Sequence, residues 1–159
     1  MLSINYYPLN EDISKYESIN NYQNIFIEYS EKIPSLADAL YQMFKSTGIS
    51  DQKVYDITQY IIKKAEKIVR FNFDLIKEKY SMMTEIDAII ICSYSCEYEI
   101  DSNFSPYKIL NINLNKENKS EGIQNISKYL FIFLKALRKL NRFFPKGKYV
   151  YRCINKKVN

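Results

Sequence analysis

The strongest constraint on the fold is an apolar stripe over residues 54–76 that keeps the 3.6-residue period of an α-helix. Its members recur three or four positions apart, with a break only at Asn72: Val54, Ile57, Ile61, Ala65, Ile68, Leu75 and Ile76. Ser50 and Asp51 precede the stripe with side chains that cap helices, and the pattern ends near Lys79. A stripe of this length needs another surface to cover it. We therefore expect a core helix within a helical layer.

Two other apolar stripes, one earlier and one later in the sequence, predict two more helices. The earlier stripe comprises Leu36, Leu40, Met43 and Phe44. The later stripe comprises Ile126, Leu130, Phe133, Leu134, Leu137 and Leu140. The Thr47-Gly48 pair ends the first of these helices, and Pro145 with Gly147 ends the last.

Two further helix starts lie between these stripes. Thr84 followed by Asp87 is a capping pattern, and it leads into the apolar run 88–92. Periodicity fits a buried strand or a helix for this run, and the cap favours a helix. Ser105 and Pro106 open the next helix, because proline fits a first turn at no cost in hydrogen bonds. Its predicted buried side is Tyr107, Leu110 and Leu114, and residues 115–122 are expected to form a polar, flexible connection.

The two ends of the chain have a different pattern. Residues 1–33 are polar and predict an arm, whereas residues 34–142 predict the helical layer. Residues 148–154 alternate side chains between two faces, as in a β-strand, and Arg152 shares a face with Val150 and Ile154. An arginine between aliphatic residues either meets an anion or extends to solvent at a sheet edge. We therefore expect one α+β domain that is mainly helical and ends in a short strand.

Composition excludes several kinds of chemistry. The chain has no histidine, so Ser-His-Asp and Cys-His catalysis are excluded, and Cys92 with Cys96 cannot complete a zinc site alone. The odd cysteine count, with no visible signal peptide or membrane span, predicts a reducing, cytoplasmic setting. The net charge is only +5, which does not favour nucleic acid as a partner. The one basic candidate for such a partner is the segment 135–142, with Lys135, Arg138, Lys139 and Arg142, continuing to Lys146 and Lys148.

The order of several segments resembles the N-terminal part of a mono-ADP-ribosyltransferase domain of the arginine-serine-glutamate class. The matching segments, over roughly residues 80–154, are Thr84-Glu-Ile-Asp-Ala-Ile89, Ser93-Tyr-Ser95, Tyr107-Lys-Ile-Leu-Asn-Ile-Asn-Leu114, Tyr129-Leu-Phe-Ile-Phe-Leu-Lys-Ala-Leu-Arg-Lys-Leu140 and Val150-Tyr-Arg152. In that family a helical subdomain precedes the first strand of an NAD-binding sheet. By this resemblance, 148–154 is the first core strand, and Tyr151 and Arg152 are the cofactor-binding residues, with Arg152 on the NAD phosphates.

The resemblance also implies that the chain is inactive alone. The family's Ser-Thr-Ser strand and its catalytic Glu-x-Glu loop follow the arginine, whereas this sequence ends at Asn159, so no catalytic residue is assigned. Cys153 replaces a usual glycine, and Asn141 replaces a common proline. The segment 93–99 contains both a Ser-x-Ser and a Glu-x-Glu, but it precedes the arginine and fits a solvated loop better. We expect weak NAD binding or none.

The main alternative is a non-catalytic helical module that binds protein. Apolar helix faces left uncovered by the fold, or an exposed sheet edge, would then bind a partner protein or a second copy of the chain. The basic residues around Arg138 give a third, weaker alternative, a binder of nucleic acid or of another anionic surface.

Overall fold

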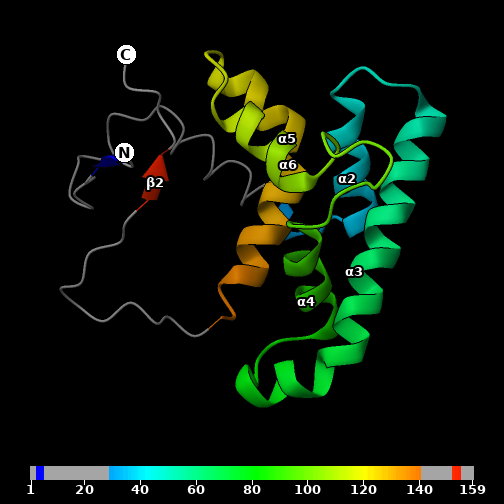
Figure 1. Cartoon of the computed structure of the whole chain (residues 1–159), viewed down its shortest axis with the longest axis vertical. Helices are drawn as coiled ribbons and strands as arrows, with labels where there is room; N and C mark the ends of the chain where they lie inside the picture. The colour runs from blue at the N-terminus through cyan, green and yellow to red at the C-terminus, as the bar shows by residue number, and fades with distance from the viewer. Residues whose placement is uncertain (1–2, 6–28, 141–151, 155–159) are drawn as a thin grey trace. The chain divides into compact units, whose positions relative to one another are not determined.

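The computed structural model describes residues 3–5, 29–140 and 152–154 of the chain (Figure 1). The chain divides into two units. One combines its two ends, Met1–Tyr16 and Arg142–Asn159, and the other spans Glu17–Asn141. The first unit contains a single antiparallel pairing between β1 (Ser3–Asn5) and β2 (Arg152–Ile154), in which Asn5 lies opposite Arg152.

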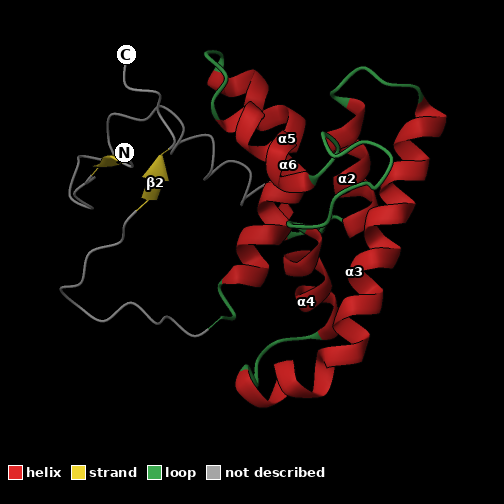
Figure 2. Ribbon diagram, viewed as in Figure 1, coloured by secondary structure: helices red, strands yellow, loops and turns green. Residues whose placement is uncertain are grey.

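All regular secondary structure in the described part of the second unit is helical, as the ribbon in Figure 2 shows. Its five bounded helices are α2 (Leu36–Lys45), α3 (Asp51–Lys79), α4 (Glu85–Ser93), α5 (Pro106–Leu114) and α6 (Lys119–Leu137). α6 packs against α2, α4 and α5, and α3 packs against α2 and α4. The core therefore lies between α6 and α3, with α2 and α4 filling the space between them (Figure 1).

The predicted α+β fold is wrong. Residues 29–140 contain helices and connections but no strand. The segment predicted as the first strand of a larger sheet is described only at Arg152–Ile154, where it pairs with Ser3–Asn5. Two strands of three residues each present no face large enough to form a layer. The described fold is a helical bundle.

The helix starts follow the capping residues that the sequence provides. Ser50 accepts a hydrogen bond from the Lys53 amide at the start of α3, and Thr84 with Asp87 forms a reciprocal capping box at the start of α4. Pro106 occupies the first turn of α5. At the end of α2 the backbone turns at Gly48, whose φ of 82° favours glycine. These predicted boundaries are confirmed.

Two predictions about the helices are wrong. Residues 115–122 are not one flexible connection, because Asn118 caps α6 and Gly122 lies buried in its first turns. In α3, the predicted core positions Ile68 and Leu75 are 45% and 68% exposed, while Val69 is buried. The first half of α3 packs between neighbours, whereas the face that carries Ile68 and Leu75 has no described element against it.

Candidate binding groove

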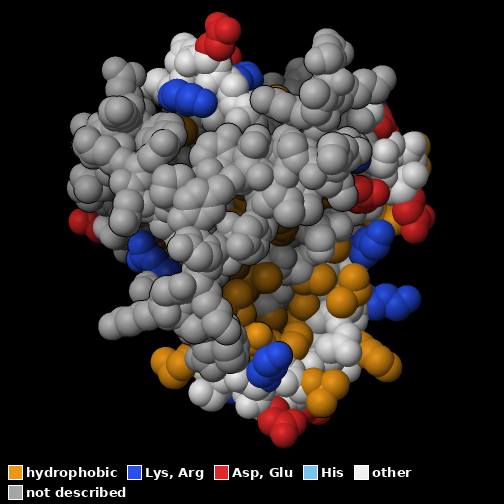
Figure 3. Space-filling view, turned by 60° about the vertical axis from the view of Figure 1, so that its left-hand side comes forward, with side chains coloured by type: hydrophobic (Ala, Val, Ile, Leu, Met, Phe, Trp, Pro, Cys, Tyr) orange, Lys and Arg blue, Asp and Glu red, His pale blue; other side chains and the backbone are white. Residues whose placement is uncertain are grey.

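Three adjoining hollows lie along α6 in the described helical unit. All three are lined by Ile33, and two of them share Lys135. Their volumes are about 420, 300 and 280 Å³. In the space-filling view, hydrophobic side chains gather around a hollow with cationic side chains at its margin (Figure 3). We call the three hollows together the Ile33 groove, and the largest of them the Asp87 pocket.

The Asp87 pocket has an apolar side and a polar side. The apolar side chains come from the segment before α2 and from three helices: Ile33, Pro34, Leu36, Ile86, Ile90 and Ile132. The polar ones are Ser35 before α2, Thr84 and Asp87 at the start of α4, Lys135 of α6 and Lys139 beyond its end. An open pocket with mostly aliphatic walls and a few convergent polar groups suits an amphipathic ligand.

Asp87 joins α4 to the end of α6. Its Oδ2 atom accepts hydrogen bonds from the Thr84 amide at 3.2 Å, from Thr84 Oγ1 at 2.5 Å and from Lys139 Nζ at 2.5 Å. Burial raises the pKa of this carboxyl group, but the hydrogen bonds from Lys139 and Thr84 outweigh that effect, and its net pKa lies below the ordinary value. Asp87 is therefore a charged structural anchor in the pocket wall.

The segment that carries Ile33 is tied to α6 through Tyr29. The Tyr29 hydroxyl lies 3.0 Å from Ser127 Oγ, and its ring packs 5.6 Å from that of Phe131. Gln42 of α2 extends this network, because its side-chain amide donates to Ser127 Oγ at 3.2 Å. At the other end of the segment, Ser35 caps α2. These contacts fix both ends of the wall that contains Ile33.

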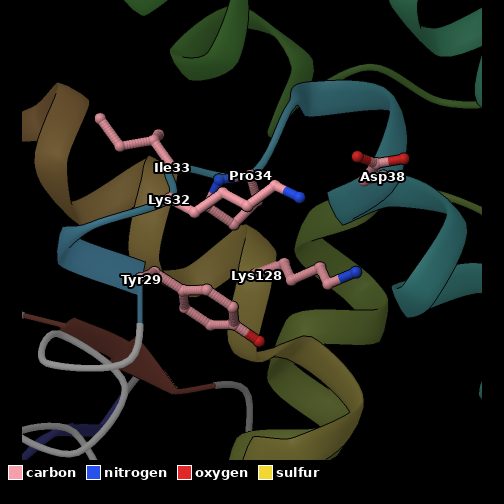
Figure 4. A pocket seen from close by; sticks show the side chains of 6 residues that line it. All are labelled: Tyr29, Lys32, Ile33, Pro34, Asp38 and Lys128. Atoms are coloured by element: carbon pink, nitrogen blue, oxygen red, sulfur yellow. The ribbon is translucent and has the colours of Figure 1, made fainter.

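The groove carries an excess of cations. Lys128, Lys135 and Lys139 are seven and four positions apart, so they lie along one face of α6 and its exit. Lys139 is neutralised by Asp87, but Lys32, Lys128 and Lys135 form no ion pair within residues 29–140. Figure 4 shows the ammonium groups of Lys32 and Lys128 extending in the same direction, with Asp38 on α2 beyond them. The groove thus combines apolar walls with three lysines that form no ion pair within residues 29–140, although Asp38 lines the same hollow as Lys32 and Lys128.

The structure does not describe the side chains of the predicted cofactor-binding residues. Tyr151 lies outside the described residues, and Arg152 is described only as a backbone position in β2. Among the basic candidates, Lys139 is bound to Asp87, whereas Arg142, Lys146 and Lys148 lie outside the described residues. Sequence reasoning had placed Lys135 and Lys139 in a basic segment of a helix and its exit, but it missed Lys128, which lies seven positions before Lys135 on the same face.

The Ser-x-Ser and Glu-x-Glu segment has structural roles where it is described. Ser93 is fully buried, donates to the Ile90 carbonyl oxygen and lies 2.9 Å from the Tyr129 hydroxyl. Glu97 accepts a hydrogen bond from Tyr107 at 2.9 Å and pairs with Lys108 at 3.6 Å. Ser93 and Glu97 therefore each have structural partners of their own.

The two described thiols are poor candidates for nucleophiles or metal ligands. Burial raises the pKa of Cys92, and it raises the pKa of Cys96 to about 11. Within the described residues, no group of three His, Cys, Asp or Glu side chains could hold a metal ion. Across the same residues, no helix is both long and apolar enough to cross a lipid bilayer.

Comparisons with known proteins do not bear on the groove or on the resemblance to mono-ADP-ribosyltransferases. That resemblance, with the roles it implies for Tyr151 and Arg152, stays a prediction. The function proposed below rests on the geometry of the helical unit. No family model, no curated protein and no solved structure matches this chain.

Proposed function

We propose that the helical unit is a non-catalytic interaction module whose Ile33 groove binds an acidic, amphipathic helix of a partner protein. The observation that carries the proposal is the combination of apolar walls with Lys128 and Lys135, two cations on one face of α6 that form no ion pair within residues 29–140. Aliphatic side chains of the partner helix would fill the apolar hollows. Carboxylates of the same helix would pair with Lys128 and Lys135 at the edge of the groove. Helix-in-groove recognition uses this combination of anchors and rim charges.

Two features favour binding over catalysis. The chain has no histidine, and the pKa values of the described thiols are raised rather than lowered. The carboxylate of the Asp87 pocket is also engaged, because Asp87 is bound to Thr84 and Lys139. A catalytic acid or base would need a pKa near neutrality, whereas the pKa of Asp87 is lowered. The proposal also places the protein in a reducing compartment, where these cysteines would remain free thiols.

A synthetic peptide tests this proposal directly. The probe is a labelled amphipathic helix with leucine on one face and glutamate on the other, titrated with the full chain and followed by fluorescence anisotropy. We expect saturable binding that weakens as salt rises, because exposed charge pairs are screened. A matched peptide with lysine in place of glutamate should bind at least about tenfold more weakly.

Variants of the groove locate the binding site. Lys135→Glu and Ile33→Asp should each weaken the acidic peptide by about fivefold to tenfold, because each removes a rim charge or an apolar contact. Lys63→Glu changes the same charge on the exposed face of α3 and should leave binding unchanged. The proposal fails if the acidic peptide does not bind, or if Lys63→Glu weakens it as much as Lys135→Glu.

An oligonucleotide distinguishes the weaker alternative. Binding of a single-stranded DNA probe depends on contacts between phosphates and cations. Lys135→Glu would weaken these contacts, and Ile33→Asp would not. If DNA binds as tightly as the acidic peptide and Ile33→Asp affects neither probe, the groove is an anionic-polymer site. Protein binding would then be excluded as its main function.

A further inference from the structure

The second half of α3 carries an exposed apolar stripe that the groove does not use. Ile68, Phe71 and Leu75 are spaced three and four positions apart, so they lie on one face of the helix. Their exposed fractions are 45%, 90% and 68%. Single exposed hydrophobic residues are ordinary, but three in register on one helix face mark an interaction surface. We call these three residues the α3 stripe.

The α3 stripe faces away from α4. Arg70 donates to Glu85 at the start of α4 at 3.1 Å and lies 3.7 Å from Glu66, so this side of α3 is turned toward α4. In a helix, Phe71 follows Arg70 by about 100°, and Ile68 and Leu75 lie on the Phe71 side. The stripe is therefore a surface of its own, outside the contact between α3 and α4.

Charged residues beside the stripe are ordered along the helix. Lys64 and Lys67 lie toward its amino-terminal end, and Asp74 and Glu78 lie toward its carboxyl-terminal end. Lys67, Asp74 and Glu78 form no ion pair within residues 29–140, and Lys64 packs over the Tyr60 ring at 5.7 Å. A second copy of the same helix in parallel would place like charges together. An antiparallel copy would place each cation opposite an anion.

We propose that two copies of this chain associate through antiparallel α3 helices, with the α3 stripes in contact. In this two-fold arrangement Lys67 faces Asp74 of the partner subunit, and Lys64 faces Glu78 of the partner subunit. Both pairs are centred next to Phe71, in the middle of the stripe, and symmetry repeats each pair. The apolar residues supply the buried surface, and the charge order selects the antiparallel direction.

The length of the contact sets its strength. The helix from Lys64 to Glu78 is roughly 22 Å long at about 1.5 Å per residue. One pair of helices of this length buries less surface than a stable obligate dimer. We expect a weak dimer with a dissociation constant on the order of 10–100 µM.

Sedimentation equilibrium of the full chain measures this association. Phe71→Glu should weaken dimerisation by at least about tenfold, because it places a carboxylate in the centre of the apolar contact. Ile100→Glu is the matched control: Ile100 is 83% exposed in the connection between α4 and α5 and should not affect dimerisation. Circular dichroism checks that both variants keep the helix content of the original chain.

A charge exchange tests the direction of the pairing. Lys67→Glu alone should weaken the dimer by about fivefold to tenfold, and adding Asp74→Lys should restore it. Restoration requires that residues 67 and 74 face each other across two copies. The proposal is overturned if the original chain is monomeric up to millimolar concentration, if Phe71→Glu has no effect, or if the double variant stays as weak as Lys67→Glu.

The same variants separate this inference from the function of the groove. Lys135→Glu should leave sedimentation unchanged, and Phe71→Glu should leave binding of the acidic peptide unchanged. Loss of both properties in Phe71→Glu, with helix content kept, would show that the two surfaces are one site. That outcome would contradict the independence of the α3 stripe.

Discussion

Gly122 of α6 lies so close to Asn113 of α5 that a Cβ atom at residue 122 would be 2.1 Å from the Asn113 carbonyl oxygen. No real side chain tolerates that separation, and the obstacle is backbone rather than a flexible side chain. The contact between α5 and α6 therefore depends on the absence of a side chain at this position. Asn125 strengthens the same contact, because its amide donates to Asn113 Oδ1 at 3.0 Å.

Gly122→Ala should destabilise the helical unit by about 1–3 kcal/mol, although alanine is the better helix former. The overlap with Asn113 forces α5 and α6 apart, and that cost exceeds the gain in helix propensity. Denaturation by urea measures the change. Gln124→Ala, at an exposed position of the same helix, is the control and should have little effect. Equal stability of Gly122→Ala and the original chain would contradict the close contact.

The Asp87–Lys139 pair predicts a pH dependence of stability. The pKa of Asp87 is lower in the folded chain than its ordinary value of about 3.9, so the pair stabilises the fold fully above about pH 4. That contribution is lost as the pH falls from there through the lowered pKa. Thermal unfolding between pH 3 and pH 7 should therefore show a lower Tm at the acidic end. In Asp87→Asn this part of the acid dependence should disappear.

Removing the cation should also destabilise the fold at neutral pH. Lys139→Met leaves the largely buried carboxylate of Asp87 without its charge partner, at a cost of about 1–3 kcal/mol. Lys116→Met removes the cation of the more exposed pair with Glu121 and should cost clearly less. Similar losses in the two variants would show that Asp87 is solvated rather than anchored.

Thr58 offers a prediction of opposite sign. Its side chain is buried in the core face of α3, and its Oγ1 atom has no hydrogen-bond partner in the described unit. Thr58→Val replaces that hydroxyl with a methyl group of similar shape and should stabilise the fold by about 1 kcal/mol. Urea denaturation decides, and a loss of stability would mean that the hydroxyl forms a hydrogen bond in solution.

NAD binding through Arg152 and Tyr151 stays a prediction of the resemblance, with weak binding or none expected. Calorimetric titration of the full chain with millimolar NAD should therefore give little or no heat of binding. The matched variant is Arg152→Ala, which should behave like the original chain. Clear heat that disappears in Arg152→Ala would contradict this expectation and would support a dinucleotide site near β2.

The sequence predicted local features of the fold better than its long-range contacts. The capping box of Thr84 and Asp87 was visible because its partners are three residues apart. The bond from Lys139 to the same carboxylate spans 52 residues and depends on how α4 and α6 pack. The groove was missed for the same reason, since Ile33 and Lys135 meet only in the folded chain.

Periodicity also overstated the core. It assigned Ile68 and Leu75 of α3 to the interior because they continue the stripe that begins at Val54. A helical pattern records which residues share a face, but it does not show where the neighbouring helix ends. Gly122 illustrates the opposite error. Glycine within a polar segment suggested a loop, yet here it permits the close approach of two helices.

Neighbouring elements pack against the first half of α3 more completely than against its second half, and this difference should affect hydrogen exchange. Amide protons near Val54 and Ile61 lie between packed neighbours, so they should exchange with solvent deuterium only when the whole unit unfolds. Amide protons beyond Phe71 lie in turns with a bare face, where local fraying is enough to release them. A single continuous helix would thus contain a slow-exchanging half and a fast-exchanging half, with the change between them close to Val69.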